Sequence, residues 1–238
     1  MIPSRFNGPP GSANGGYTCG VLAQLLGADV AQVSLRTPPP IGRPLAVNHE
    51  DGRVELHDDD GTLVAEGEAS ELLLDVPDPV DPDTAEAASA AGLDTWAAAH
   101  PFPTCVICGP ERAEGDGYRI FPGAVEGRDG IFAAPWTPDE SLAGEDGHVR
   151  PECLWGALDC PTSAPVANFG VGPPVVLARL TARIGCAVRV GEPHSLVSWP
   201  LEVDGRKRHG GCALFDESGR LLCASKALWI ELRDQPAA

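Results

Sequence analysis

An internal repeat constrains the fold of this 238-residue chain more than any other feature. Asp60–Leu72 and Ser218–Ile230 share one pattern, a hairpin turn with glycine followed by a long run typical of a single strand. In each copy a short apolar helix and several strand-like runs precede that long strand. A helix followed by antiparallel strands is an α+β unit, and two such units can bury their helices and sheet faces together.

The first copy begins with a short helix. Asn14 is a favourable N-cap, the apolar residues after it fall largely on one face, and Gly27 ends the helix. Turn residues then separate a series of strand-like runs. We expect these strands at Ala31–Arg36, Leu45–His49, Arg53–His57 and Leu63–Leu74.

A proline-rich segment, residues 76–83, lies between the copies and is typical of a linker. Residues 84–99 are alanine-rich and predict a helix capped near Asp83 or Thr84. The helix of the second copy begins at Pro151. The strands expected around it are Tyr118–Phe121, Ile131–Ala134, Val175–Ile184, Ser195–Val203, His209–Phe215 and Leu221–Leu232. The chain divides into a first unit (1–75), a linker with its helix (76–99) and a second unit (100–238).

The bulk composition excludes some classes of function. A formal charge of −17 disfavours general binding to nucleic acid, which requires basic surface. No apolar run is long enough to span a bilayer, and the N-terminus does not resemble a secretory signal, so we expect a cytoplasmic protein with no membrane partner. Buried reduced thiols explain the eight cysteines better than a disulfide framework does.

Asp159 is the residue in the second copy that most invites a chemical role. Leu154, Trp155 and Leu158 form one apolar face of the helix that begins at Pro151, and Asp159 follows directly. A carboxylate is costly to bury in such surroundings unless it is paired, hydrogen-bonded or used in chemistry. The alternative is that it bonds the backbone at the helix end, as short polar side chains often do.

These features together resemble the hotdog-fold thioesterase superfamily in its fused, double-hotdog form. Many members open a central helix with His-Gly-Gly and carry an acid seven residues after the second glycine. Here Asn14-Gly15-Gly16 takes that place in the first helix, while the second helix has Pro151-Glu152 there and Asp159 seven residues after Glu152. The stretch Cys105-Val106-Ile107-Cys108-Gly109 is also similar to the start of a hotdog domain.

The resemblance implies two fused hotdog units, each with an antiparallel sheet wrapped around a helix. It also implies an acyl-CoA thioesterase, with coenzyme A present only as part of the substrate and no separate cofactor. Asp159 would act as the general base or position the water. Thr162, which follows it closely in the sequence, could help to orient that water or could equally satisfy the helix end. We expect the chains to associate further as a homodimer or a higher homo-oligomer.

Asn14, Gly15 and Gly16 would form the oxyanion hole, because amides at a helix start can stabilise developing negative charge. Their alternative role is capping and close packing. The first helix has no acid seven residues after Gly16. The second helix begins with proline and a carboxylate in place of the two glycines. A complete site can therefore form only where the glycine end of the first helix faces Asp159. This predicts one site per chain.

Arg206, Lys207 and Arg208 form the only tight basic cluster in the sequence. These side chains could bind the phosphates of coenzyme A, for which guanidinium and ammonium groups are suitable donors. The alternative is a solvated hairpin edge, where basic residues discourage aggregation.

Cys105 and Cys108 have the spacing of a pair of zinc ligands, but zinc usually needs four. His100 could be a third ligand, whereas Cys153 and Cys160 lie in a helical run and do not supply the missing pair. We therefore expect no metal, and a turn shaped by the two cysteines.

Three functions remain open from the sequence. The first is hydrolysis of an acyl-CoA thioester. The second is hydration or dehydration of an enoyl thioester, for which we find no matched Asp–His pair. The third is binding of acyl-CoA without catalysis, with Asp159 in a structural role.

Overall fold

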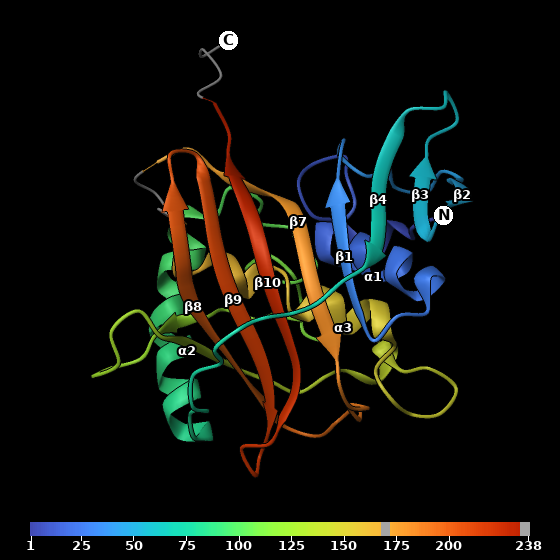
Figure 1. Cartoon of the computed structure of the whole chain (residues 1–238). Coiled ribbons are helices and arrows are strands. Elements are labelled where there is room, and N and C mark those ends of the chain that lie inside the picture. The colour runs from blue at the N-terminus through green and yellow to red at the C-terminus, as the bar shows by residue number, and fades with distance from the viewer. Residues whose placement is uncertain (168–171, 234–238) are drawn as a thin grey trace.

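A single antiparallel sheet organises the computed structural model, which describes residues 1–167 and 172–233. Within these residues the sheet has ten strands in the order β2-β3-β4-β1-β7-β10-β9-β8-β6-β5 (Figure 1). The strands of the first half are β1 (Val30–Leu35), β2 (Ala46–Glu50), β3 (Arg53–His57) and β4 (Leu63–Ala69). Those of the second half are β5 (Gly123–Ala124), β6 (Phe132–Trp136), β7 (Val175–Ile184), β8 (His194–Asp204), β9 (Lys207–Asp216) and β10 (Leu221–Glu231).

The strand order repeats about the middle of the sheet. β1 pairs with β7 in antiparallel fashion, with Val33 opposite Leu180. Outward from β1 the order is β4-β3-β2, and outward from β7 it is β10-β9-β8. The two halves thus share one connectivity, as the internal repeat predicted. β5 and β6 extend only the second half, whose sequence has more residues before its helix.

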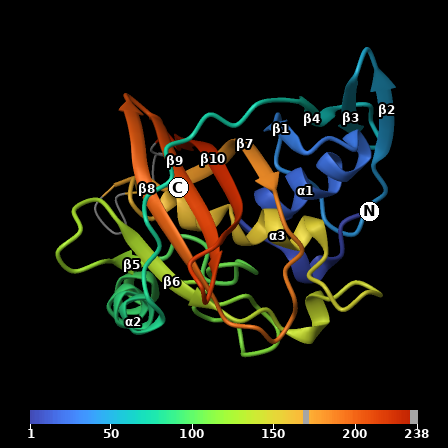
Figure 2. The ribbon, with the colours of Figure 1, turned by 60° about the horizontal axis from the view of Figure 1, so that its bottom comes forward.

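Two helices, α1 (Gly15–Leu26) and α3 (Pro151–Ala157), lie together against one face of the sheet (Figure 2). Asn14 caps α1, with its side-chain oxygen accepting a hydrogen bond from the Tyr17 N–H at 2.8 Å, and Gly27 ends it at φ 62°. These are the predicted ends of that helix.

Small residues on α1 allow the two helices to approach closely. A Cβ at Gly16 would lie 2.3 Å from the Cβ of Asp159, and one at Gly20 would lie 2.6 Å from the Cα of Glu152. Gln24, one turn further on, donates a hydrogen bond to Glu152. The start of α1 therefore faces the end of α3, and the helices run antiparallel.

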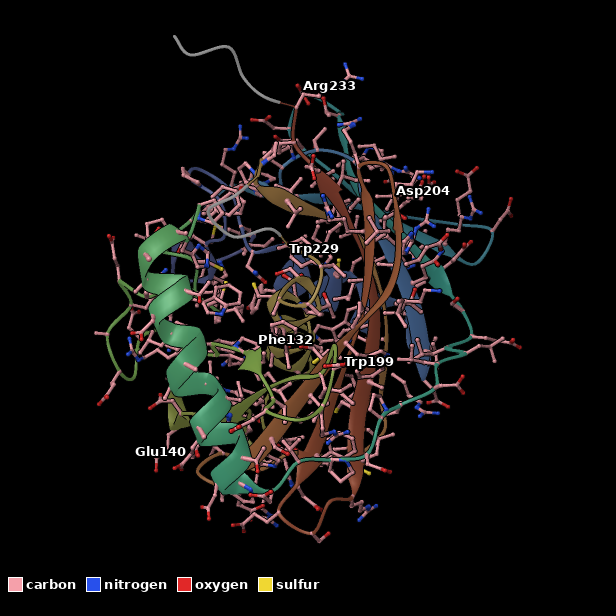
Figure 3. The ribbon with its side chains drawn as sticks, turned by 90° about the vertical axis from the view of Figure 1, so that its left-hand side faces the viewer. Phe132, Glu140, Trp199, Asp204, Trp229 and Arg233 are labelled. Carbon is pink, nitrogen blue, oxygen red and sulfur yellow. The ribbon has the colours of Figure 1, made fainter. Side chains whose placement is uncertain are left out.

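The third helix, α2 (Pro82–Ala99), packs against β5, β6 and β8 (Figure 3). Its cap is Asp81, which accepts a hydrogen bond from the Thr84 N–H at 2.9 Å; the expected cap at Asp83 or Thr84 was wrong. The expected linker is also well packed. Residues 70–81 cross the front of the sheet as drawn in Figure 1, and Val80 is buried with the side chains of Trp199 and Phe215 in a second apolar core.

Three local predictions differ from the structure. β4 ends at Ala69, so its predicted extension to residue 74 is irregular. No strand forms over Tyr118–Phe121, because Arg119 takes a left-handed conformation with φ 55° that interrupts extended backbone. α3 ends at Ala157, and a 3-10 turn, Cys160–Ser163, follows it. Asp159 therefore lies beyond the helix and not on it.

Candidate active site

Asp159 lies where the end of α3 meets the start of α1, and its side chain is buried with only 1% of the residue exposed. Its Oδ2 atom accepts hydrogen bonds from the Asn14 Nδ2 at 3.0 Å and from the Gly16 backbone N–H at 2.9 Å, and the Cys160 Sγ lies 4.0 Å from the same oxygen. Asn14 is itself fixed as the cap of α1. The two donors thus hold one oxygen of the carboxylate in a defined orientation.

The other oxygen, Oδ1, is buried and has no hydrogen-bond partner among the described residues. Burying a carboxylate oxygen without a hydrogen-bond donor is costly. We therefore expect a water molecule or a ligand to donate to Oδ1. Burial raises the pKa of Asp159 to about 7, although the hydrogen bonds from Gly16 and Asn14 act in the opposite direction. The carboxyl group can therefore exist in both protonation states near neutral pH.

A cavity of about 960 Å³ opens beside this carboxylate. Its walls are mainly apolar and come from both halves of the chain, including β1, β7, β10 and the N-terminal segment. Representative lining residues are Asn14, Gly15, Leu35, Leu177, Trp229 and Asp159. A large apolar cavity with few convergent polar groups is the usual form of a small-molecule site.

The backbone amides of Gly15 and Gly16, at the start of α1, differ in what they contact. The Gly16 N–H is already bound to Asp159, so it does not face an incoming group. Gly15 lines the cavity, and no acceptor within the described part of the chain takes its N–H. Of the two glycine amides expected to form an oxyanion hole, the structure leaves only that of Gly15 available.

Thr162 does not reach the cavity. Its hydroxyl donates to the Asp159 carbonyl oxygen at 2.6 Å and accepts from the Trp229 Nε1 at 2.7 Å, and the residue is fully buried. It therefore stabilises the turn after α3, which is the alternative role that the sequence left open, and it has no contact with a cavity water.

The opposite ends of the two helices form no equivalent site. There Gln24 of α1 donates to the Glu152 Oε2 at 2.7 Å, and Glu152 also pairs with Arg150. Among the described residues a buried acid beside a helix start occurs only at the Gly16 end. The chain is asymmetric, as the different helix starts predicted.

The basic cluster lies at the β8–β9 hairpin, near the end of β10. Arg206 donates to the Glu231 carbonyl oxygen at 3.0 Å, and the Arg208 Nε donates to the Glu231 carboxylate at 3.2 Å. Figure 3 shows Asp204, at the hairpin, and Arg233, after β10, at the same end of the sheet. Ile230, which pairs with Lys207 across the strands, lines the cavity. The cluster is thus close to the cavity rim, with Arg206 and Lys207 exposed to solvent.

Sequence reasoning missed a group of sulfur atoms in the same cavity wall. Cys105, Cys108 and Cys160 are buried, and their Sγ atoms lie within 4.8 Å of one another. His100 lies beside them, with its Nε2 atom 3.1 Å from the Cys108 Sγ. The expectation that Cys160 stays in a helical run, away from the other two, is wrong because α3 ends three residues before it. No signal along the sequence showed this contact.

Comparison with solved structures supports the hotdog fold. The chain is similar to the tesB protein of Mycobacterium avium subspecies paratuberculosis, with a TM-score of 0.60, 13% identity, and coverage of 98% of this chain and 91% of that one. It is also similar to the acyl-CoA thioesterase II TesB2 of Mycobacterium marinum (TM-score 0.55, 10% identity, 92% and 90% covered). A hot dog protein of unknown function from Alicyclobacillus acidocaldarius gives a TM-score of 0.61 at 10% identity, with 98% and 92% covered.

No protein-family model matches this sequence, and neither does any curated protein. The likeness to solved structures shows that the chain has the hotdog fold found in the thioesterase superfamily. At these identities the likeness concerns the fold, and the chemistry has to be argued from the site. No helix among the described residues is long and apolar enough to cross a membrane.

Proposed function

We propose that this chain is a double-hotdog acyl-CoA thioesterase with one composite active site between its two units. The observation that carries the proposal is the Asp159 carboxylate. Asn14 and Gly16 hold its Oδ2, while Oδ1 is buried without a partner beside a cavity of about 960 Å³. This arrangement suits a base that positions and activates one water molecule for attack on a thioester.

The reaction follows from the roles of these groups. A water molecule bound to Oδ1 attacks the thioester carbonyl carbon and gives a proton to Asp159 as the new C–O bond forms. The N–H of Gly15, at the positive end of α1, donates to the oxyanion that develops. The C–S bond then breaks, the thiolate of coenzyme A leaves, and the proton returns from Asp159 to the products.

The apolar cavity and the basic cluster at its rim favour a CoA ester over a short thioester. Apolar walls such as Leu35, Leu177 and Trp229 would hold the acyl group. Arg206, Lys207 and Arg208 at the rim would bind the phosphates of the nucleotide, with Arg206 and Lys207 the more available because Arg208 pairs with Glu231.

All eight cysteines are free, which favours a reducing compartment such as the cytoplasm. Association into a homodimer or a higher homo-oligomer stays a prediction.

The test measures free thiol release from a panel of acyl-CoA esters, with hydration of enoyl-CoA esters followed in parallel. Thiol release with at least one acyl class, and no hydration, is the expected result. Hydration without thiol release would favour the hydratase alternative, and tight binding without either reaction would favour a non-catalytic acyl-CoA binder.

A further inference from the structure

A second arrangement in the cavity wall lies outside the proposed hydrolysis. Cys105 and Cys108 come from the tight loop that follows α2, whereas Cys160 comes from the turn after α3. The sequence separates Cys105 from Cys160 by 55 positions, yet their Sγ atoms are 3.8 Å apart. Three thiols brought together from two segments, all buried, form a possible set of metal ligands.

The spacing of the sulfurs fits tetrahedral zinc. Two thiolates bound at about 2.3 Å and separated by the tetrahedral angle place their sulfurs about 3.8 Å apart. The Cys105–Cys160 distance of 3.8 Å equals that value, and the third sulfur, of Cys108, lies within 4.8 Å of both. One ion could therefore contact all three sulfurs after only small side-chain adjustments.

The loop that carries Cys105 and Cys108 is held in a tight turn. The Gly109 N–H donates to the Cys105 carbonyl at 2.8 Å, and a Cβ at Gly109 would lie 2.5 Å from that carbonyl, so only glycine fits this tight turn. The turn thus holds Cys105 and Cys108 in one tightly packed loop at the cavity wall.

Two side-chain N–H groups also face the sulfurs. The Asn14 Nδ2 lies 3.9 Å from the Cys105 Sγ and 3.8 Å from the Cys160 Sγ. His100 Nδ1 accepts a hydrogen bond from the Phe102 N–H at 2.9 Å, so in the neutral ring the proton is on Nε2, 3.1 Å from the Cys108 Sγ. His100 is thereby positioned as a donor to a thiolate.

We propose that Cys105, Cys108 and Cys160 bind one zinc ion as thiolates, with His100 donating a hydrogen bond to the Cys108 sulfur. Soft thiolate ligands select zinc over the harder divalent cations. All three cysteines line the cavity, so the fourth coordination position opens toward it and takes a water molecule. The ion would join the 105–109 loop to the turn that carries Asp159, and so hold that turn in place.

The first experiment measures metal content in protein purified without a metal-affinity column. We expect about one zinc per chain by mass spectrometry of the elements. X-ray absorption at the zinc edge should show three Zn–S distances of about 2.3 Å and one lighter ligand. Protein without zinc that cannot be loaded to one equivalent would overturn the proposal, as would a Cys105–Cys160 disulfide in the freshly purified chain.

Variants identify the ligands. Cys105→Ser, Cys108→Ser and Cys160→Ser should each lose zinc, whereas Cys212→Ser, at a buried cysteine outside the cluster, should keep it. If the ligand variants fold poorly, absorption of the cobalt-substituted wild-type protein still reports the sulfur ligands. Zinc retained by all three ligand variants would contradict the proposal.

His100→Ala has a different expected result. It should keep one zinc per chain and three Zn–S distances but bind the ion about 10–100-fold more weakly, as the loss of a partner to a ligand usually does. A change in the number of light ligands around zinc in this variant would overturn the assignment of His100 as a donor.

Discussion

The Asp159 carboxylate accepts a hydrogen bond of 2.9 Å from the backbone N–H of Gly16, a residue 143 positions earlier in the chain. This bond joins the end of one central helix to the start of the other. It also gives the two halves of the chain unequal parts in the candidate site, because the first half supplies the helix start and the second supplies the acid. Substitutions on either side of this bond test that division.

Asn14→Ser separates the two roles of Asn14. Serine still caps α1 by accepting the Tyr17 N–H, but its shorter side chain lacks the amide group with which Asn14 donates to the Asp159 Oδ2 at 3.0 Å. We expect nearly unchanged thermal stability and a kcat about tenfold lower, equivalent to about 1.4 kcal/mol. Steady-state kinetics and a melting curve measure the two effects; an unchanged kcat at unchanged stability would show that Asn14 acts only as a cap.

Gly16→Ala should damage the site by steric means. The added Cβ would lie 2.3 Å from the Asp159 Cβ and 2.8 Å from the Trp155 carbonyl oxygen, so the helices must separate. We expect a loss of about 1–3 kcal/mol in stability, as for other overpacked cores, together with a loss of turnover.

The matched variant is Gly15→Ala, whose Cβ would mainly approach methyl groups of Leu177 and Leu35 at 2.9 and 3.0 Å. Those side chains can adjust, so a smaller loss of stability is expected in denaturant unfolding. Equal destabilisation by the two substitutions would contradict the close helix contact at Gly16.

Replacing Arg206, Lys207 and Arg208 with alanine should raise KM for CoA esters by about tenfold or more, since each charge-assisted hydrogen bond contributes about 1.5–3 kcal/mol. KM for a short thioester without the nucleotide should change little. Added salt should have the same effect, because exposed charges are screened over about 8–10 Å.

Arg183→Ala is the control for the basic cluster, because Arg183 lies at the end of β7 opposite the cavity. We expect this variant to keep the wild-type KM for CoA esters. Equal changes in KM for both substrate types in the triple variant would place the cluster away from the nucleotide.

Each chain should bind one acyl-CoA. A calorimetric titration with a non-hydrolysable acyl-CoA analogue should saturate at one equivalent per chain. The reason is that the opposite helix ends form a Gln24–Glu152 pair in place of a site. Saturation at two equivalents would contradict the composite site.

The local part of the fold was predictable because hydrophobic periodicity and turn glycines act over short stretches. α1 begins after its Asn14 cap and ends at Gly27, and β7 covers the predicted Val175–Ile184. The facing of Gly16 and Asp159 could also be inferred, since each helix lacks the part that the other supplies.

Other contacts between distant segments could not be inferred from the sequence. The early end of α3 turns Cys160 toward Cys105, and nothing in the spacing of the cysteines indicates that turn. The hydrogen bond from the Gly16 N–H to Asp159 likewise depends on how closely the two helices pack. A glycine motif in the sequence indicates an accessible backbone N–H, but it does not indicate which acceptor that N–H donates to.

The most direct test of the central claim is the kcat of Asp159→Asn on an acyl-CoA that the wild-type chain hydrolyses. Asparagine keeps the size of the side chain but removes the base, so kcat should fall by about a hundredfold or more with little change in stability. The control is Glu152→Gln, at the opposite ends of the helices, which should turn over normally. If Asp159→Asn also turns over at the wild-type rate, Asp159 is structural and the proposed mechanism is wrong.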